Sequence, residues 1–485
     1  MKHVRTKFLQ RKSGAQARAA SHATAAHARQ VWLVLLALFA FSLQATAEQP
    51  RRLPPVYLET WQTINSPLPE VGGWAESVSL DSTSWTGSRA PEPLNLFDCD
   101  VETGMAATIE LDMLHDFNAL GLRPDVPVLK EFITASIPVG GEAARRDNRT
   151  GFSPNQTNLE AWAHTETELG RLVGYTKMNI TRSSTLTEFQ IYKAYGELGW
   201  LKAGFDYTLW LNQAASPSTL DFEGPNAVPF IIFPQISIKV PLDGIGLSPD
   251  CFFVFGLEDA PADVTLPRLT IPDANTVNRI PSIIAKWIYE PEHMHVEVGG
   301  MVRHVTAQGT GYRSDVDGWG LTASGRFDGR GKDNFIIAGQ VGKMIGAYSQ
   351  DTLGLQLDAA PRSATDPNLR GIQGGGGWVA YKHWWTENIR SSATYGYWFL
   401  DTNFDVRPNP VGTFLQTNYS SINLIWSPVP SVDMGVECIY GNRKVNVNTA
   451  VDGSRFGENH RIQATVRWNF GAGSPAPVYR SPPPP

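Results

Sequence analysis

Short and long connections alternate along most of this chain, and they separate segments that share one side-chain pattern. From about residue 104, apolar and polar side chains alternate over segments of about ten residues, which is typical of β-strands with one apolar face. The expected short turns lie at about 166–170, 196–199, 241–246, 290–293, 328–332, 386–388 and 427–431. The expected long loops lie at about 119–155, 212–226, 258–279, 305–317, 347–374, 402–416 and 443–456, and one further short connection lies near 182–186.

This order of connections separates two β-architectures that share the alternating pattern. A soluble sandwich alternates too, but short turns at one end and long loops at the other are typical of a bacterial transmembrane barrel. Lipid offers the backbone no hydrogen-bond partner, so strands can span it only in a closed barrel. We therefore expect an all-β chain that forms a closed, antiparallel transmembrane β-barrel of about 16 strands over residues 104–470.

The N-terminal region has the pattern of an export signal. Seven basic residues and no acidic ones occur in residues 1–47, and an apolar run at 31–43 precedes Ala45-Thr46-Ala47. A basic region, an apolar run and a small-residue cleavage site predict a cleaved signal peptide over 1–47, and the run is too short for a transmembrane helix. We expect residues 48–103 to form a periplasmic N-terminal extension, residues 471–485 to form a Pro-rich tail, and the protein to reside in the cell outer membrane.

Composition and motifs exclude several functional classes. Without residues 1–47, 34 basic residues remain against 47 acidic ones, which argues against nucleic acid as a partner. The chain has neither G-x-S-x-G nor H-E-x-x-H, so we predict that it is not an enzyme. The pair His293 and His295 has no evident third ligand, so we expect no metal site and no cofactor.

One run of residues resembles a known family. The run Ser218–Asn226 (STLDFEGPN), the opening segment 104–118 and the closing segments 435–443 and 461–470 are similar to those of the DcaP-like trimeric outer-membrane porins. The resemblance covers about residues 104–470 and implies a sixteen-stranded homotrimer that passes small, preferentially anionic solutes. Members commonly carry an N-terminal coiled coil, whereas residues 48–100 show no heptads.

If the apolar residues of each strand face lipid, the charged ones face the lumen and line the pore. The acids on this side are fewer than the bases, which predicts a weak preference for small anionic solutes such as carboxylates; the alternative is solvated lumen charge without selectivity. The inward bases are Arg171, Lys177, Lys202, Lys286, Arg303, Arg326, Lys382, Arg390, Arg461 and Arg467. The inward acids are Glu110, Asp112, Asp206, Glu297, Asp433 and Glu437.

The long connection at 212–226 is the candidate constriction loop. Folded inward, it would place Asp221 and Glu223 opposite the basic wall residues; alternatively, Gly224-Pro225-Asn226 is only a turn before the next strand. The predicted function is thus passive diffusion of small polar solutes, with outer-membrane lipid and lipopolysaccharide around the barrel. The alternative is a non-conducting barrel that acts as an adhesin or a structural protein.

Overall fold

The structure is a computed structural model of the whole chain. No helix within the described residues is long and apolar enough to cross a membrane. The predicted signal peptide, nearly all of the predicted N-terminal extension and most of the predicted tail lie outside the described residues. The structure describes residues 101–121, 131–140, 148–182, 187–222, 224–363, 365–402, 413–446 and 453–473.

The chain forms an antiparallel sheet of 18 strands. Its strands are β1 (Glu102–Asp116), β2 (Arg149–Ser153), β3 (Asn158–Thr167), β4 (Gly170–Arg182), β5 (Thr187–Leu198), β6 (Leu201–Tyr207), β7 (Ile232–Pro241), β8 (Cys251–Glu258), β9 (Asn275–Val277), β10 (Ser282–Tyr289), β11 (Met294–Gly309), β12 (Tyr312–Asp328), β13 (Asn334–Lys343), β16 (Gln373–Trp384), β17 (Ile389–Leu400), β18 (Phe414–Val429), β19 (Val432–Val445) and β20 (Phe456–Gly473). The short strands β14 (Ala359–Pro361) and β15 (Leu369–Gly371) pair separately. The 3₁₀ helices are η2 (Thr134–Ser136), η4 (Gln213–Ala215), η5 (Asp243–Ile245) and η6 (Gly346–Tyr348).

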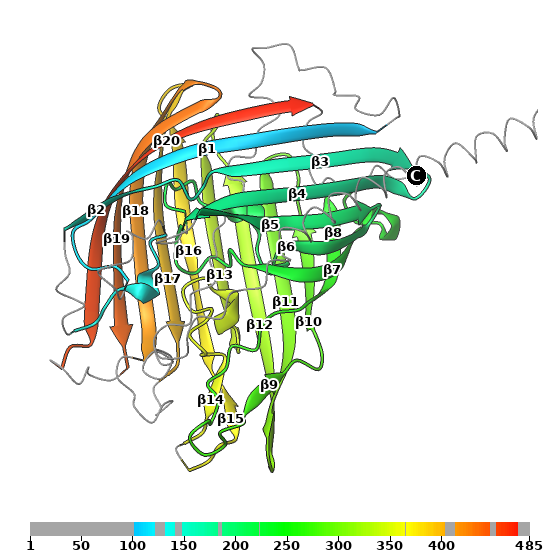
Figure 1. Cartoon of the computed structure of the whole chain (residues 1–485). Helices are drawn as coiled ribbons and strands as arrows, with labels where there is room; N and C mark the ends of the chain where they lie inside the picture. The colour runs from blue at the N-terminus through cyan, green and yellow to red at the C-terminus, as the bar shows by residue number, and fades with distance from the viewer. Residues whose placement is uncertain are drawn as a thin grey trace, which may run out of the picture.

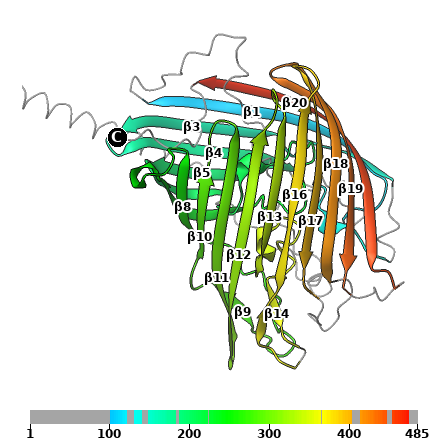
Figure 2. The same cartoon turned by 180° about the vertical axis from the view of Figure 1, so that it is seen from behind.

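These 18 strands close into a barrel whose wall is sixteen strands wide. Both β2 and β3 pair with β1, and both β9 and β10 pair with β11, so each of these couples is one interrupted strand of the wall. The first and last strands pair over most of their length, from Gly104 beside Gly473 to Asp116 beside Arg461. Figures 1 and 2 show this seam as the blue β1 beside the red β20. The predicted closed barrel of about 16 strands is confirmed.

Each strand separates an apolar outer face from an inner face. On β1, Ile109, Leu111 and Met113 are 45–48% exposed, whereas Glu110 and Asp112 between them are buried. Successive side chains of a strand point to opposite faces, and the exposed residues are the ones that face lipid. The outer apolar band therefore follows directly from the alternation in the sequence.

Most of the short connections lie at one end of the barrel, together with both ends of the described barrel chain. The β3–β4 turn occupies two residues, 168 and 169, and Glu102, at the start of β1, pairs with His164 near it. Because β20 ends beside Gly104, it finishes at the same end. We call this the turn end, and the opposite one the loop end.

The prediction of a long loop at 305–317 is wrong. Strands β11 and β12 continue to Gly309 and Tyr312, which pair directly and leave a tight turn. The reason is that alternation persists beyond the apolar band: the residues that face outward here are polar, such as His304 and Asp317, which contact each other at 2.7 Å. The hairpin extends past the other strands at the loop end, beside β9 and β14–β15 (Figure 1).

A hydrophobic core fills part of the interior of the barrel. It joins inward side chains of the wall, such as Trp378 and Trp398, to residues of the connections, such as Trp210 and Tyr348. These four aromatic side chains are almost fully buried. The inner face is therefore not uniformly polar, because long connections fold back into the lumen and cover it.

Candidate functional site

The connection between β6 and β7, residues 208–231, crosses the lumen. At its start, the Thr208 hydroxyl donates to Glu258 of β8, the strand beyond β7, at 2.7 Å. Further along, Asn212 Nδ2 donates to Ser324 on β12 at 3.0 Å. The connection reaches the opposite wall where Asn226 Nδ2 donates to Thr417 on β18 at 2.7 Å. It thus bridges walls of the barrel that are distant in strand order and occupies part of the lumen between them.

Asp221 lies at the far side of this crossing. Its carboxylate accepts hydrogen bonds from the Phe132 amide and the Tyr419 hydroxyl, both at 3.1 Å. The Asp221 amide donates to Glu437 of β19 at 2.8 Å. The structure thus places Asp221 inside the barrel as an anchor of the connection, and Glu223 lies outside the described residues. The turn at Gly224, with φ of 65°, is also present.

A second pair of connections folds inward and meets at Arg303 of β11. The Arg303 guanidinium is buried; it donates to Asp358 at 2.8 Å, to the Pro261 carbonyl at 2.7 Å and to the Met344 carbonyl at 2.6 Å. Asp263 accepts from the amides of residues 354 and 356, both at 2.9 Å. We call Arg303, Asp358 and Asp263 the Arg303 cluster. It fastens the β8–β9 and β13–β16 connections to the wall and to each other.

The closed arrangement of these two connections should be most stable at acidic pH. Burial and the nearby Asp358 carboxylate raise the pKa of Asp263 from 3.8 to about 7, although the Gln356 and Gly354 amides and Arg303 oppose this rise. At a pH between 3.8 and about 7, Asp263 loses its proton when the segment opens and keeps it when the segment is closed. A rise in pH therefore favours the opened segment, and above about pH 7 the closed arrangement has lost this stabilisation completely. We expect protease cleavage in 259–274 and 344–358 to accelerate between pH 5 and 8.

The variant Asp263→Asn is the matched control for this pH dependence, because it keeps an acceptor oxygen and cannot titrate. Limited proteolysis of the purified protein at each pH measures the cleavage rate. A wild-type rate that stays flat over this range, or an equally steep rate in Asp263→Asn, would contradict the role of Asp263.

Most of the predicted inward bases are in ion pairs with acids. Arg461 contacts Asp116 at 2.8 Å and Arg467 contacts Glu110 at 2.6 Å, and all four side chains are buried. Asp112 is buried and accepts from Gln463 at 3.0 Å. The remaining pairs are Lys177–Glu160 at 2.9 Å, Lys202–Asp206, Lys286–Glu297 at 2.5 Å, Arg303–Asp358 at 2.8 Å and Arg390–Asp433 at 2.9 Å.

Partly accessible inward cations lie towards the turn end. The side chains of Arg171 and Arg326 are 36% and 35% exposed, and each has a nearby acid, Glu166 at 3.9 Å and Asp328 at 3.1 Å. Lys382 of β16 lies on the same inner face and is half-buried. The turn end thus keeps ionic groups in contact with water, whereas the central wall charges are buried.

Several charged residues escaped the sequence analysis. Glu160 and Lys193 lie on strands whose alternation would have placed them inside; Asp358 and Asp263 lie in connections, where no periodicity gives a direction. With these residues included, eleven inner bases stand against nine inner acids, so the excess of bases is smaller than the strand positions alone predict. The sequence count covered selected strand positions and could not include the inward connections.

The described residues contain no group of three His, Cys, Asp or Glu side chains that could hold a metal ion. His293 is largely exposed near the β10–β11 turn. His295 points inward between Glu290 at 3.4 Å and Glu297 at 3.0 Å. The two histidines therefore point in different directions. His293 lies in the turn before β11, where the alternation of a strand does not apply, and His295 lies in the strand.

Comparison with known proteins agrees with this architecture. The family model described as DcaP outer membrane protein matches residues 278–470, and that of the Porin subfamily matches residues 134–239. The outer membrane channel DcaP of Acinetobacter baumannii is similar in structure, with a TM-score of 0.64 and 15% identity over 79% of this chain and 100% of that one. The outer membrane protein OmpT of Vibrio cholerae gives a TM-score of 0.46 and 8% identity, over 77% of this chain and 99% of that one. No curated protein matches the chain.

The closed barrel and the two matching families define the class: the chain is an outer-membrane porin, a channel protein rather than an enzyme. Within this class it is DcaP-like. The resemblance to the DcaP-like porins is thereby confirmed. The DcaP match includes the closing segments 435–443 and 461–470, and the run Ser218–Asn226 lies in the Porin subfamily match.

Proposed function

We propose that this porin is a narrow channel for the passive diffusion of small polar solutes, with a weak preference for anions such as small carboxylates. The observation that carries the proposal is the crossing of the lumen by residues 208–231, anchored at Asn212 and Asn226 to distant strands. A crossing segment reduces the open section of a sixteen-stranded barrel, which is otherwise wide enough for an aqueous channel.

The preference for anions has two supports. The partly exposed bases Arg171, Arg326 and Lys382 occupy the turn end of the inner face, where charges select among entering ions. The DcaP-like resemblance implies the same preference. The ion pairs of the central wall contribute little, because they are buried away from the water of the channel.

Reversal potentials in planar bilayers test this preference. Under a salt gradient, we expect the purified protein to give the potential of a weakly anion-selective pore, and Arg171→Gln combined with Arg326→Gln to shift it towards cations. Lys332→Gln, in an exposed turn, is the matched control and should change it less. Clear cation selectivity of the wild type would overturn the proposal, and the absence of conductance would favour the adhesin or structural alternative.

We also propose that three copies assemble along the seam of the barrel. An apolar groove of about 430 Å³ lies on the outer wall here, between side chains such as Met113 of β1, Trp426 of β18 and Val436 of β19. The short side chain of Ala464 on β20 contributes to this groove, and a neighbouring copy could fill it. The same bilayer records test assembly, because a trimer closes in three equal conductance steps and a monomer in one.

A further inference from the structure

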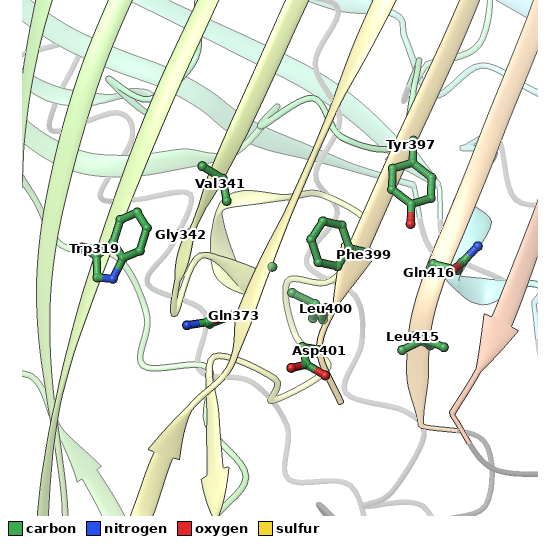
Figure 3. A pocket seen from close by; sticks show the side chains of 11 residues that line it. Trp319, Val341, Gly342, Gln373, Tyr397, Phe399, Leu400, Asp401, Leu415 and Gln416 are labelled. Atoms are coloured by element: carbon green, nitrogen blue, oxygen red, sulfur yellow. The ribbon is translucent and has the colours of Figure 1, made fainter. Parts of the chain in front are cut away.

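A second groove, of about 400 Å³, opens on the outer wall across β12, β13, β16, β17 and β18. Figure 3 shows Trp319 on one side and Tyr397 and Phe399 on the other, with Gln373 between them. Gly342 and Gly374 are paired across β13 and β16 and also line the groove. Because glycines add no side chain, this part of the groove is backbone, bordered by aromatic rings.

The groove lies at the loop-end edge of the apolar band. Towards the turn end, the outward residues of the same strands are apolar, and Leu321 and Ile337 are 57% and 47% exposed. Towards the loop end, the outward residue after Trp319 on β12 is the charged Asp317, which is well exposed. The wall therefore changes from lipid-facing to water-facing at the groove. With the short turns in the periplasm, this edge is in the outer leaflet.

The loop end of the groove is polar, and a lysine lies next to it in the sheet. Gln373 and Asp401 line this end, and Lys343 is the register neighbour of both Trp319 and Gln373. Lys343 has no ion pair with any residue that the structure describes, unlike the bases inside the barrel. An unpaired cation beside an apolar slot at membrane-interface height matches a lipid with an anionic head group.

We infer that this groove binds one acyl chain of a phosphorylated glycolipid of the outer leaflet, with its phosphate beside Lys343. A second copy of the chain fits less well, because it would bury Lys343 without a partner acid. An acyl chain is narrow enough to lie between Trp319 and Phe399. The inference depends on the outer-leaflet orientation and not on which solute the channel passes.

Filling the groove tests the inference. The change Val341→Phe adds a ring at a lining position that is 49% exposed, so the new side chain occupies the slot without entering the core. Ile337→Phe is the matched control: it lies on the same outward face of β13, with 47% exposure, and outside the groove. Native mass spectrometry of the detergent-purified protein, titrated with purified lipid A, measures the fraction that carries one lipid.

We expect Val341→Phe to lower this fraction by about tenfold, since most of the chain contact is lost, and Ile337→Phe to leave it nearly unchanged. Lys343→Gln should weaken binding of lipid A but not of its dephosphorylated form. The inference fails if the wild type binds no lipid A, if both phenylalanine variants lose binding equally, or if Lys343→Gln affects both lipids alike. Circular dichroism of each variant, unchanged from the wild type, shows that the barrel has folded.

Discussion

Replacing residues 212–226 by a short glycine–serine linker should raise the single-channel conductance at least about twofold, because a crossing segment limits the open section of the lumen. The replaced residues include Asn212 and Asn226, which anchor the segment to β12 and β18. The wall itself does not depend on them, since its strands pair with one another throughout. The variant should therefore still form a barrel.

Conductance in planar bilayers at fixed salt concentration is the measurement. The matched control replaces residues 363–367, the tip of the exposed β14–β15 hairpin, with glycines; this shortens no segment that crosses the lumen and should leave conductance unchanged. If the linker variant conducts like the wild type, residues 208–231 do not restrict the pore, and the narrow channel proposed here is wrong.

The second large effect is expected at the Arg303 cluster. Changing Arg303 to Met removes the cation from a buried site that still contains Asp358, and breaking a buried pair in this way costs about 3–5 kcal/mol. Three further groups lose a partner or a neighbouring charge: the Pro261 and Met344 carbonyls and Asp263. We expect a lower melting temperature and faster protease cleavage within 259–274 and 344–358.

A double-mutant cycle separates the ion pair from general damage. Adding Asp358→Asn to Arg303→Met removes the uncompensated charge, so the double variant should be more stable than Arg303→Met alone. Arg326→Met is the control, because its pair with Asp328 is about a third exposed and such pairs contribute about 0–1 kcal/mol. Equal losses in Arg303→Met and Arg326→Met would show that the cluster does not fasten the two connections.

The wall of the barrel could be predicted because each of its rules is local. Residues such as Ile109 and Glu110 are adjacent, so alternation assigns them to opposite faces without any knowledge of the rest of the chain. The turns at 166–170 and 290–293 were also recognisable, since they interrupt that alternation. The prediction of a loop at 305–317 is wrong because the alternation continues there beyond the membrane, with polar residues on the outer face.

The candidate site was only partly predictable, for the opposite reason. The sequence pointed to the 212–226 connection and to Asp221, but it gave no partner for Asp221. Glu437 and Tyr419 are about 200 positions away along the chain, and the contacts exist because β18 and β19 face the crossing segment inside the barrel. Likewise, nothing local connects Arg303 with Asp263 and Asp358.

The sequence by itself determined the closed β-wall, its lipid-facing side and the end at which the short turns lie. These follow from a two-residue period and from the need to pair every backbone group within lipid. Only the tertiary structure decided which charges are exposed in the lumen and which are buried in ion pairs. That outcome depends on where long connections of irregular backbone fold, and contacts between residues far apart in the chain, such as Asp221 with Glu437, decide it.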